Sequence, residues 1–269
     1  MDTESIGTYI LYASIIILFI ILLWYLTVTL RSDTSPHVDA VITPILPNSF
    51  PFPIFIVNLD RSPDRYQYMT DHLNSFGLTG YKRWQASDGS KIDPSDMITA
   101  GVNKHMVHTR KGGAGCSMSH IQLWRYMVKH KIDWTLILED DALLHPQFLQ
   151  LFHHYWNKLP QKVKIFYLGY CDEKITSDEL VFEQGVICTH AYMLSWQGAK
   201  YLLDKLVPLQ STIDGSLKDH FSSHSGSYIA NCNITIDNIT PSKYRGGGGI
   251  IYQNTEKCGS VLEDINWDK

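Results

Sequence analysis

An uncharged segment near the amino terminus divides this chain into two parts with different chemistry. No charged residue occurs between Ser5 and Leu30, and from Tyr9 onward only Ser14, Thr27 and Thr29 interrupt the apolar side chains. A helix over residues 9–30 would extend about 33 Å, which matches a hydrocarbon core of roughly 30 Å. We therefore expect a short tail over residues 1–8, a single transmembrane anchor over residues 9–30, and the lipid bilayer as the partner of that helix.

A buried core helix or a cleaved signal peptide would be the alternatives for this segment. A signal peptide begins with a basic region, whereas Asp2 and Glu4 precede the apolar run. Trp24 and Tyr25 near its end are typical of a membrane interface. Arg31 weakly favours a cytosolic carboxyl-terminal part, and the glycosylation sequons at Asn233 and Asn238 are no more than chance would supply. The orientation of the anchor stays open.

The rest of the composition is that of a globular protein. Of the 269 residues, 44% are hydrophobic and 19% are charged, which excludes a disordered or fibrous chain. The net charge of −4 excludes the basic surface of a nucleic-acid-binding protein. Five cysteines leave at least one thiol free if all partners lie within the chain, and the redox compartment stays undecided.

Two regions follow the apolar segment. Five of the eleven prolines fall between residues 31 and 53, so residues 31–52 are expected to form a semi-extended stem. Residues 53–269 are expected to form one domain in which strands alternate with helices. The predicted strands cover residues 53–59, 81–86, 134–138, 164–170 and 190–195, and the predicted helices cover residues 63–75, 117–129 and 197–206. This order predicts an α/β fold with a mostly parallel sheet flanked by helices, and a ligand site at the carboxyl ends of the strands.

Three adjacent acids, Glu139, Asp140 and Asp141, end one of the apolar strands. In extended backbone Glu139 and Asp141 would face one way and Asp140 the other. Carboxylates that repel one another need a cation or a helix dipole nearby, and oxygen ligands suit Mg²⁺ or Mn²⁺. A solvated turn at the end of a strand is the simpler alternative.

Two further segments carry groups that could bind anions. Arg61 and Arg65 lie at the start of a predicted helix, a position that favours phosphate, although a surface ion pair between Asp64 and Arg65 would explain them as well. Glycines in the stretch 112–120 precede another predicted helix and could present free N–H groups. Within that stretch, His120 could be a core residue, and no feature activates Cys116 as a nucleophile.

Taken together, five motifs in this order resemble glycosyltransferase family 25, which includes lipooligosaccharide and procollagen galactosyltransferases. The resemblance covers about residues 53–221. It implies a GT-A-like fold, a nucleotide-sugar donor (commonly UDP-galactose), a Mn²⁺-type metal and inversion at the transferred sugar carbon. The motifs are IVNLDRSPDR at 56–65, ASDG at 86–89, GCSMSH at 115–120, ILEDDA at 137–142 and AYMLSWQGAKYLL at 191–203.

The resemblance also implies roles for individual residues of this chain. The acidic triplet would hold Mn²⁺ or Mg²⁺ against the donor diphosphate. The general base would be Asp214, with His220 or Asp219 as alternatives, although the surrounding TIDGSL sequence departs from the family pattern. The residues that match the donor-binding motifs are Asn58, Asp60, Arg61, Arg65, Asp88, Gly89, Ser117 and His120.

These implications describe a membrane-anchored glycosyltransferase that moves galactose or another hexose from a UDP-sugar to a hydroxyl of a glycan or protein. By analogy with anchored transferases, we expect it at a membrane of the secretory pathway. A catalytically silent carbohydrate-binding or adhesion module is the alternative from another class. A metal-dependent phosphohydrolase would use the same acids, but no further set of strand-end ligands supports it.

Overall fold

The computed structural model describes residues 12, 15–22, 40–171, 180–182, 185–224, 226–230, 244–245, 248–249 and 251–254. The chain divides into two compact units, Met1–Val38 and Asp39–Lys269. In the first unit, Tyr12 and residues 15–22 are helical, and their side chains are more than half exposed wherever they are large and apolar. The tail 1–8, residues 31–39 of the predicted stem and the rest of the predicted anchor 9–30 lie outside the described residues. Within the described ranges, no helix combines the length and the apolarity that a membrane crossing requires.

A seven-stranded sheet forms the centre of the second unit, with the strand order β2-β1-β3-β8-β5-β9-β7. Strands β1, β2, β3, β5 and β9 all run in one direction, and β8 and β7 run against them. The sheet is therefore mixed, with the predicted parallel arrangement interrupted at β8 and β7. The strands are β1 (Ile54–Asn58), β2 (Tyr81–Gln85), β3 (Thr135–Glu139), β5 (Ile165–Tyr167), β7 (Leu180–Phe182), β8 (Ala191–Leu194) and β9 (Ser227–Ala230).

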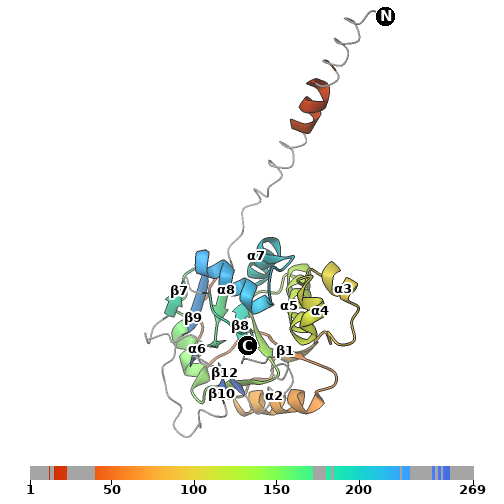
Figure 1. Cartoon of the computed structure of the whole chain (residues 1–269). Coiled ribbons are helices and arrows are strands. Elements are labelled where there is room, and N and C mark those ends of the chain that lie inside the picture. Colours follow the sequence, from red (N-terminus) through yellow and green to blue (C-terminus); the bar gives the residue numbers. More distant parts are fainter. Residues whose placement is uncertain are drawn as a thin grey trace, which may run out of the picture. The chain divides into compact units, whose positions relative to one another are not determined.

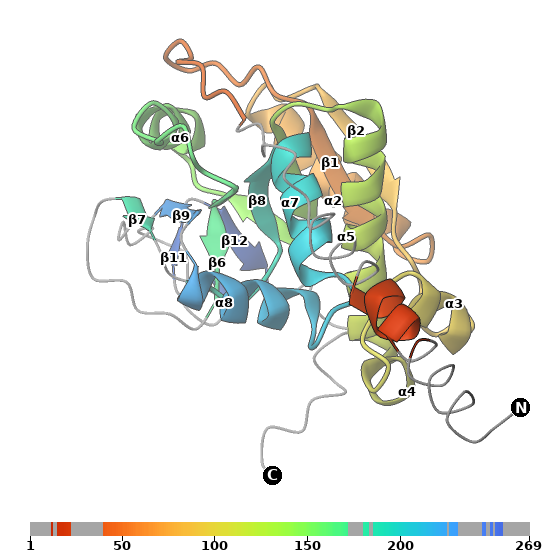
Figure 2. The ribbon, with the colours of Figure 1, turned by 90° about the horizontal axis from the view of Figure 1, so that it is seen from above.

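Helices cover both faces of this sheet (Figures 1 and 2). Alternate residues of β1 point to opposite faces, so Ile54 and Ile56 join one buried cluster while Phe55 and Val57 join the other. The first face is covered by α2 (Pro63–Ser75) and α6 (Phe148–Trp156). The second is covered by α3 (Pro94–Thr99), α4 (Met106–Thr109), α5 (Lys111–His130), α7 (Trp196–Leu206) and α8 (Ile213–Ser223).

Two small antiparallel sheets bring the carboxyl-terminal part of the chain beside the main sheet. Strand β12 (Ile251–Asn254) pairs with β4 (Ala142–Leu144) and with β10 (Tyr244–Arg245). Strand β11 (Gly248–Gly249) pairs with β6 (Gly169–Tyr170). None of these strands except β6 was predicted, because elements of two to four residues carry too little periodicity to be recognised.

The second half of the predicted stem belongs to the domain. Ala40 and Ile42 are buried, and the backbone N–H of Ile42 donates to Gln161 Oε1 at 2.9 Å. The indole N–H of Trp156, at the end of α6, donates to the carbonyl of Thr43 at 2.9 Å. Residues 40–50 thus cover the end of α6, and the compact unit begins before the predicted boundary at residue 53.

Helix α5 begins at Lys111, six residues before the predicted start at Ser117. The glycines of this stretch are therefore helical and do not form a loop. A Cβ atom on Gly115 would overlap the carbonyl of Ser87 and lie 2.6 Å from the backbone nitrogen of Gly89. The missing side chains allow the first turns of α5 to approach the 86–89 loop closely.

Two alanine substitutions in the first turns of α5 test this close approach. Gly115→Ala should lower the free energy of unfolding by about 1–3 kcal/mol, because the new methyl group meets backbone that cannot move aside. Gly113→Ala in the same helix should raise it by up to about 1 kcal/mol, because its Cβ would have no neighbour closer than the Met106 sulfur at 3.8 Å. Urea denaturation of both variants provides the comparison, and equal effects would contradict the packing described.

Candidate active site

Several predicted site residues meet at one edge of the main sheet. The carboxyl ends of β1, β2 and β3 lie side by side at Asn58, Gln85 and Glu139. Strand β8 runs the other way, so its amino-terminal end lies at the same edge, and the backbone N–H of Glu139 donates to the carbonyl of His190 at 2.9 Å. Segments that are distant in sequence are thereby brought to the place where α/β sheets bind ligands.

The acidic triplet forms a turn, and one arginine of α2 holds two of its members. Strand β3 ends at Glu139, and Asp140 and Asp141 form the turn that follows. Both aspartates contact Nη2 of Arg65, Asp141 at 3.3 Å and Asp140 more closely. The amide nitrogen of Asn58 donates to Asp140 at 2.6 Å. The prediction that Asp140 faces away from Asp141 is therefore wrong, because strand alternation stops at Glu139.

The acidic turn carries more negative than positive charge. Burial raises the pKa of Asp140 to about 6, against the opposing effects of Arg65 and Asn58, and the neighbouring charges of Asp141 and Glu139 add to the increase. One guanidinium group, that of Arg65, contacts the two carboxyl groups of Asp140 and Asp141, and Glu139 next to them adds a third carboxyl group. An added divalent cation would therefore find a favourable potential at this turn.

Glu139 points to different partners. Its Oε1 accepts a hydrogen bond from Thr189 at 2.7 Å and lies 3.4 Å from Nε2 of His120. Burial would raise the pKa of Glu139, but these contacts with His120 and Thr189 outweigh it, and the pKa is lowered. A carboxylate is therefore kept ionised at this end of the triplet.

His120 supports Glu139 from inside the core. Its ring is fully buried, with Nδ1 2.7 Å from the hydroxyl of Tyr192. That hydroxyl accepts a hydrogen bond from Trp124 at 3.0 Å, so its own proton is available for Nδ1, which leaves the Nε2 proton directed toward Glu139. Because His120 has no exposed surface, we assign it to positioning Glu139 rather than to direct contact with a donor.

Ser117 is the second predicted donor-binding residue of α5, and it too is fully buried. Its hydroxyl accepts a hydrogen bond from the backbone N–H of Ile213 at 3.1 Å. This bond attaches the first turn of α8 to α5. Ser117 therefore does not face solvent. By holding Ile213 it positions Asp214, the residue that follows Ile213.

Asp214 is the one predicted base that the described contacts join to this edge. Its carboxylate accepts from the backbone N–H groups of Gly215 at 2.9 Å and Cys188 at 3.4 Å. His220 lies on the same helix but bonds the hydroxyl of Tyr201 at 2.9 Å and stacks on His224. Asp219 is exposed.

Cys116 lies beside these acids, with its Sγ 4.0 Å from Oε1 of Glu139. Burial raises the pKa of its thiol well above the ordinary value, and the charges of Glu139, Asp214 and Asp141 raise it further. A thiolate is the nucleophilic form of cysteine, so this environment disfavours nucleophilic chemistry at Cys116. Asp214 lies close to the acidic turn, because it binds the backbone N–H of Cys188, whose neighbour Thr189 binds Glu139.

The exposed residues of the edge form ion pairs around the loops after β1 and β2. Arg61 pairs with Asp88 at 2.5 Å, and Asp60 accepts hydrogen bonds from Arg83 at 2.8 Å and Gln85 at 2.6 Å. Position 89 accommodates only glycine, because a Cβ atom there would overlap the carbonyl of Lys111 in α5. These groups could bind phosphate, ribose or base, and Gly89 supports them by close packing.

Arg83 belongs to the site, although the sequence does not identify it as a site residue. Its Nε donates to the side-chain oxygen of Asn58 at 2.8 Å, which turns the amide nitrogen of Asn58 toward Asp140. In the sequence Arg83 is one polar residue of an edge strand, and only the pairing of β2 with β1 reveals its neighbour.

A disulfide between Cys171 and Cys188 was also not predicted. It joins the end of β6 to the segment that precedes β8. Cys188 and Thr189 in this segment contact Asp214 and Glu139. Among the described residues Cys116 is the free cysteine. The spacing of five cysteines could not identify the pair, because pairing depends on the fold.

Asp88 offers a test of the electrostatics at this edge. Burial would raise its pKa, but hydrogen bonds from Ser90 and Arg61 lower the pKa to about 2. A lowered pKa stabilises the folded state at pH values above the ordinary value of about 3.8, and this contribution disappears as the pH falls toward 2. We expect Asp88→Asn to lower the free energy of unfolding by about 1 kcal/mol at pH 7, because solvent screening reduces the effect of the pKa shift at this surface.

Urea denaturation of wild type and Asp88→Asn across a pH series provides the measurement. The difference between the two proteins should narrow as the pH falls from about 4 to 2. A difference that is constant across this window would show that Asp88 contributes by packing rather than by charge.

Comparisons with known proteins identify the family of this chain. The family model described as "Glycosyltransferase family 25 (LPS biosynthesis protein)" matches residues 52–217. A glycosyltransferase 25 family member of Aedes aegypti is 27% identical over 235 residues, which cover 77% of this chain and 38% of the relative. Procollagen galactosyltransferase 1-B of Xenopus laevis is 23% identical over 248 residues, covering 80% of this chain and 40% of the relative. The chain spans less than half the length of these relatives.

A solved structure is also similar, at 11% identity and a TM-score of 0.40 over 79% of this chain and 98% of the other. It is the crystal structure of a glycosyltransferase involved in the glycosylation of the major capsid of PBCV-1. The family match covers more than half of the 269 residues and contains all five sequence motifs. The chain therefore belongs to glycosyltransferase family 25.

Proposed function

We propose that this protein is a metal-dependent glycosyltransferase that moves galactose or another hexose from a UDP-sugar to a hydroxyl group of a glycan or protein, with inversion at the sugar carbon. The observation that carries this proposal is the acidic turn at the end of β3. It lies at the same edge as the ion-paired loops after β1 and β2, and the segment Cys188–Thr189 connects it to the carboxylate of Asp214.

The residues of the turn fit a divalent cation. The set consists of hard carboxylate oxygens, which suit Mn²⁺ or Mg²⁺, and its negative charge exceeds what Arg65 supplies. Asp141, with Glu139 or Asp140, would hold the ion. When bound, such an ion would stabilise the negative charge that develops on the departing nucleoside diphosphate.

The chain's own residues would perform the remaining tasks. Arg61 and Arg65 at the start of α2 would contact the diphosphate, since guanidinium groups and helix amino termini both favour phosphate. Asp60 and Asp88 offer carboxylates to the nucleoside, and their arginine partners hold them in place. Asp214 would accept the proton of the attacking acceptor hydroxyl, and its two backbone hydrogen bonds fix the carboxylate.

A catalytically silent carbohydrate-binding or adhesion module is the second candidate. Arg65 already neutralises part of the charge of Asp140 and Asp141, as it could in a protein that binds no metal. The sequence after Asp214 also departs from the family pattern. The two candidates differ in whether a metal and an acceptor drive donor turnover.

We also propose that residues 9–30 anchor the domain in a membrane of the secretory pathway. The support is the apolar sequence of this segment and the Cys171–Cys188 disulfide, since disulfides persist in oxidising compartments. On this basis the domain faces the lumen.

Protease treatment of intact microsomes tests this orientation. A lumenal domain stays protected until detergent is added, and cleavage without detergent would contradict the proposal.

Asp141→Asn tests the metal-dependent transferase. The detergent-solubilised full chain should release UDP from a UDP-sugar in the presence of Mn²⁺, with release increasing on addition of acceptor and disappearing with EDTA. The variant should lose at least about a hundredfold in turnover, because the amide removes charge that stabilises the transition state. Its thermal melting without metal should remain close to that of wild type.

A panel of UDP-sugars is needed to interpret a negative result. If no donor is hydrolysed or transferred while glycans still bind, the silent binding module becomes the better description. A large drop in thermal stability of Asp141→Asn would instead show that Asp141 is structural.

Asp214→Ala tests the general base. Transfer should fall about a hundredfold to ten-thousandfold, the range typical of general-base catalysis, while the dissociation constant for UDP should stay within about twofold. Asp204→Ala is the matched control, because Asp204 is a half-exposed aspartate on α7 that pairs with Lys200. If transfer survives in Asp214→Ala, the base lies elsewhere, and His220 and Asp219 are the next variants to measure.

A further inference from the structure

A buried histidine beside the disulfide has a ring nitrogen without a hydrogen-bond partner. His190 is 1% exposed, and its Nε2 lies 3.1 Å from the carbonyl oxygen of Ile251. A carbonyl only accepts hydrogen bonds, so Nε2 carries a proton, and in the neutral ring Nδ1 then carries a lone pair. That Nδ1 is buried and makes no hydrogen bond. An unsatisfied buried acceptor is costly, and strain, a bound water, an ion or a redox role can explain such a group.

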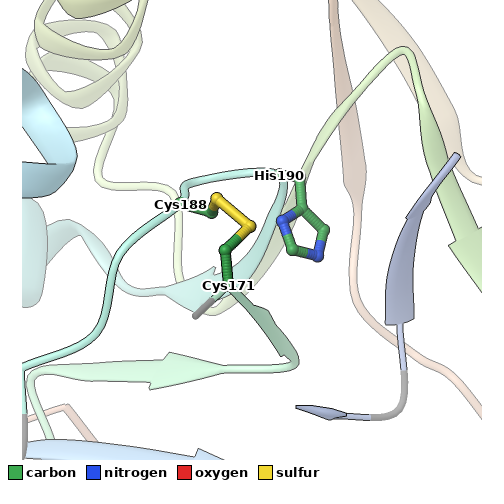
Figure 3. A group of neighbouring side chains, drawn as sticks. All are labelled: Cys171, Cys188 and His190. Carbon is green, nitrogen blue, oxygen red and sulfur yellow. A yellow bond between two sulfur atoms is a disulfide. The ribbon is translucent and has the colours of Figure 1, made fainter. Parts of the chain in front are cut away.

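The unpartnered nitrogen faces the sulfur atoms. Figure 3 shows the His190 ring beside the Cys171–Cys188 disulfide, with one ring nitrogen on the side of the sulfurs. The ligand atoms of Cys171, Cys188 and His190 all lie within 4.8 Å of one another. The ring cannot shift toward Gly169, because even a Cβ atom there would overlap Nε2 of His190 and the carbonyl of Ile251. The backbone therefore holds Nδ1 in this position.

We propose that, after reduction of the disulfide, Cys171, Cys188 and His190 bind one thiophilic divalent cation, with Zn²⁺ as the expected ion. Two thiolates and one imidazole are ligands that zinc prefers. The bond from Nε2 of His190 to a backbone carbonyl is the usual support for a histidine that binds metal through its other nitrogen. Nδ1 would thereby gain the partner it lacks.

The disulfide is first reduced to two thiols, and the reduced site then binds the ion. Two electrons from the reductant break the S–S bond: two molecules of a thiol reductant supply them with two protons and become a disulfide, or a phosphine and one water supply them and give the phosphine oxide. Both routes leave two protein thiols. Each thiol loses its proton when the ion binds. Sulfur ligands at about 2.3 Å from a tetrahedral ion lie roughly 3.8 Å apart, a separation that side chains on Cα atoms 5.7 Å apart can reach by rotation. Cys188 is partly exposed, so reductant and ion have access.

This site is distinct from the acidic turn but lies next to it. The backbone N–H of Cys188 donates to Asp214, and the following Thr189 donates to Glu139. Cys188 also has a φ of 78°, a conformation that residues with a side chain rarely adopt without restraint. A bound ion would replace the covalent cross-link and keep this segment attached to β6 in the reduced protein.

Cobalt titration of the reduced full chain tests the proposal. The protein is reduced with a phosphine, which becomes a phosphine oxide with oxygen from water, and the phosphine is removed under anaerobic conditions. We expect one Co²⁺ per chain with a thiolate-to-cobalt charge-transfer band, and displacement of Co²⁺ by Zn²⁺. Ions at carboxylate oxygens give no such band, so the acidic turn does not interfere.

Variants identify the ligands. Cys171→Ser/Cys188→Ser should abolish the band, and His190→Gln should weaken Co²⁺ binding at least about tenfold. Cys116→Ser should leave it unchanged, which excludes the other cluster of possible ligands, Cys116, His120 and Glu139. The double serine variant retains Cys116, Cys232 and Cys258 and so reports any binding by those thiols.

Three results would overturn the proposal: no band in the reduced wild type, a band that survives in the double serine variant, or full affinity in His190→Gln. If His190→Gln does not fold, alkylation of the reduced wild type decides instead. Zn²⁺ should protect Cys171 and Cys188 from alkylation at least tenfold as measured by peptide mass spectrometry, and equal alkylation with and without Zn²⁺ would refute the site. None of these readouts depends on transferase activity.

Discussion

Three carboxyl groups at the end of a buried strand are the constraint on which the candidate site depends. Such a turn folds only if each acid finds a partner, and the partners come from separate elements. Arg65 of α2 contacts Asp140 and Asp141, and Thr189, before β8, binds Glu139. Satisfying these charges brings together the loops and helix ends that an enzyme acting on a nucleotide-sugar would need.

The supports of the site lie on both faces of the sheet. His120 on α5 reaches Glu139 from one face, and its second nitrogen is fixed by Tyr192 of β8. Asn58 at the end of β1 links Asp140 to Arg83 of β2. The Cys171–Cys188 disulfide holds the segment that contacts Asp214 and Glu139. A change in any of these elements would therefore alter the positions of the side chains at the acidic turn or of Asp214.

The sequence predicted some of the elements well, left the helices α6 and α8 unpredicted, and predicted the contacts between elements poorly. Apolar runs and the start signal at Pro63 located β1, β3, β8 and α2 within one or two residues. The six-residue error at α5 arose because glycine is read as a helix breaker, whereas here its lack of a side chain permits close packing against the 86–89 loop. The role of Arg83 depends on the pairing of β2 with β1, and the disulfide depends on the fold bringing Cys188 beside Cys171. No local sequence pattern encodes either contact.

We propose that the acidic turn binds a divalent cation together with a nucleoside diphosphate. A crystal grown with Mn²⁺ and UDP, measured for anomalous scattering by manganese, would show both ligands. We expect one manganese peak in contact with Asp141 and with the UDP phosphates. UDP bound at this edge without manganese, or manganese bound away from residues 139–141, would contradict it.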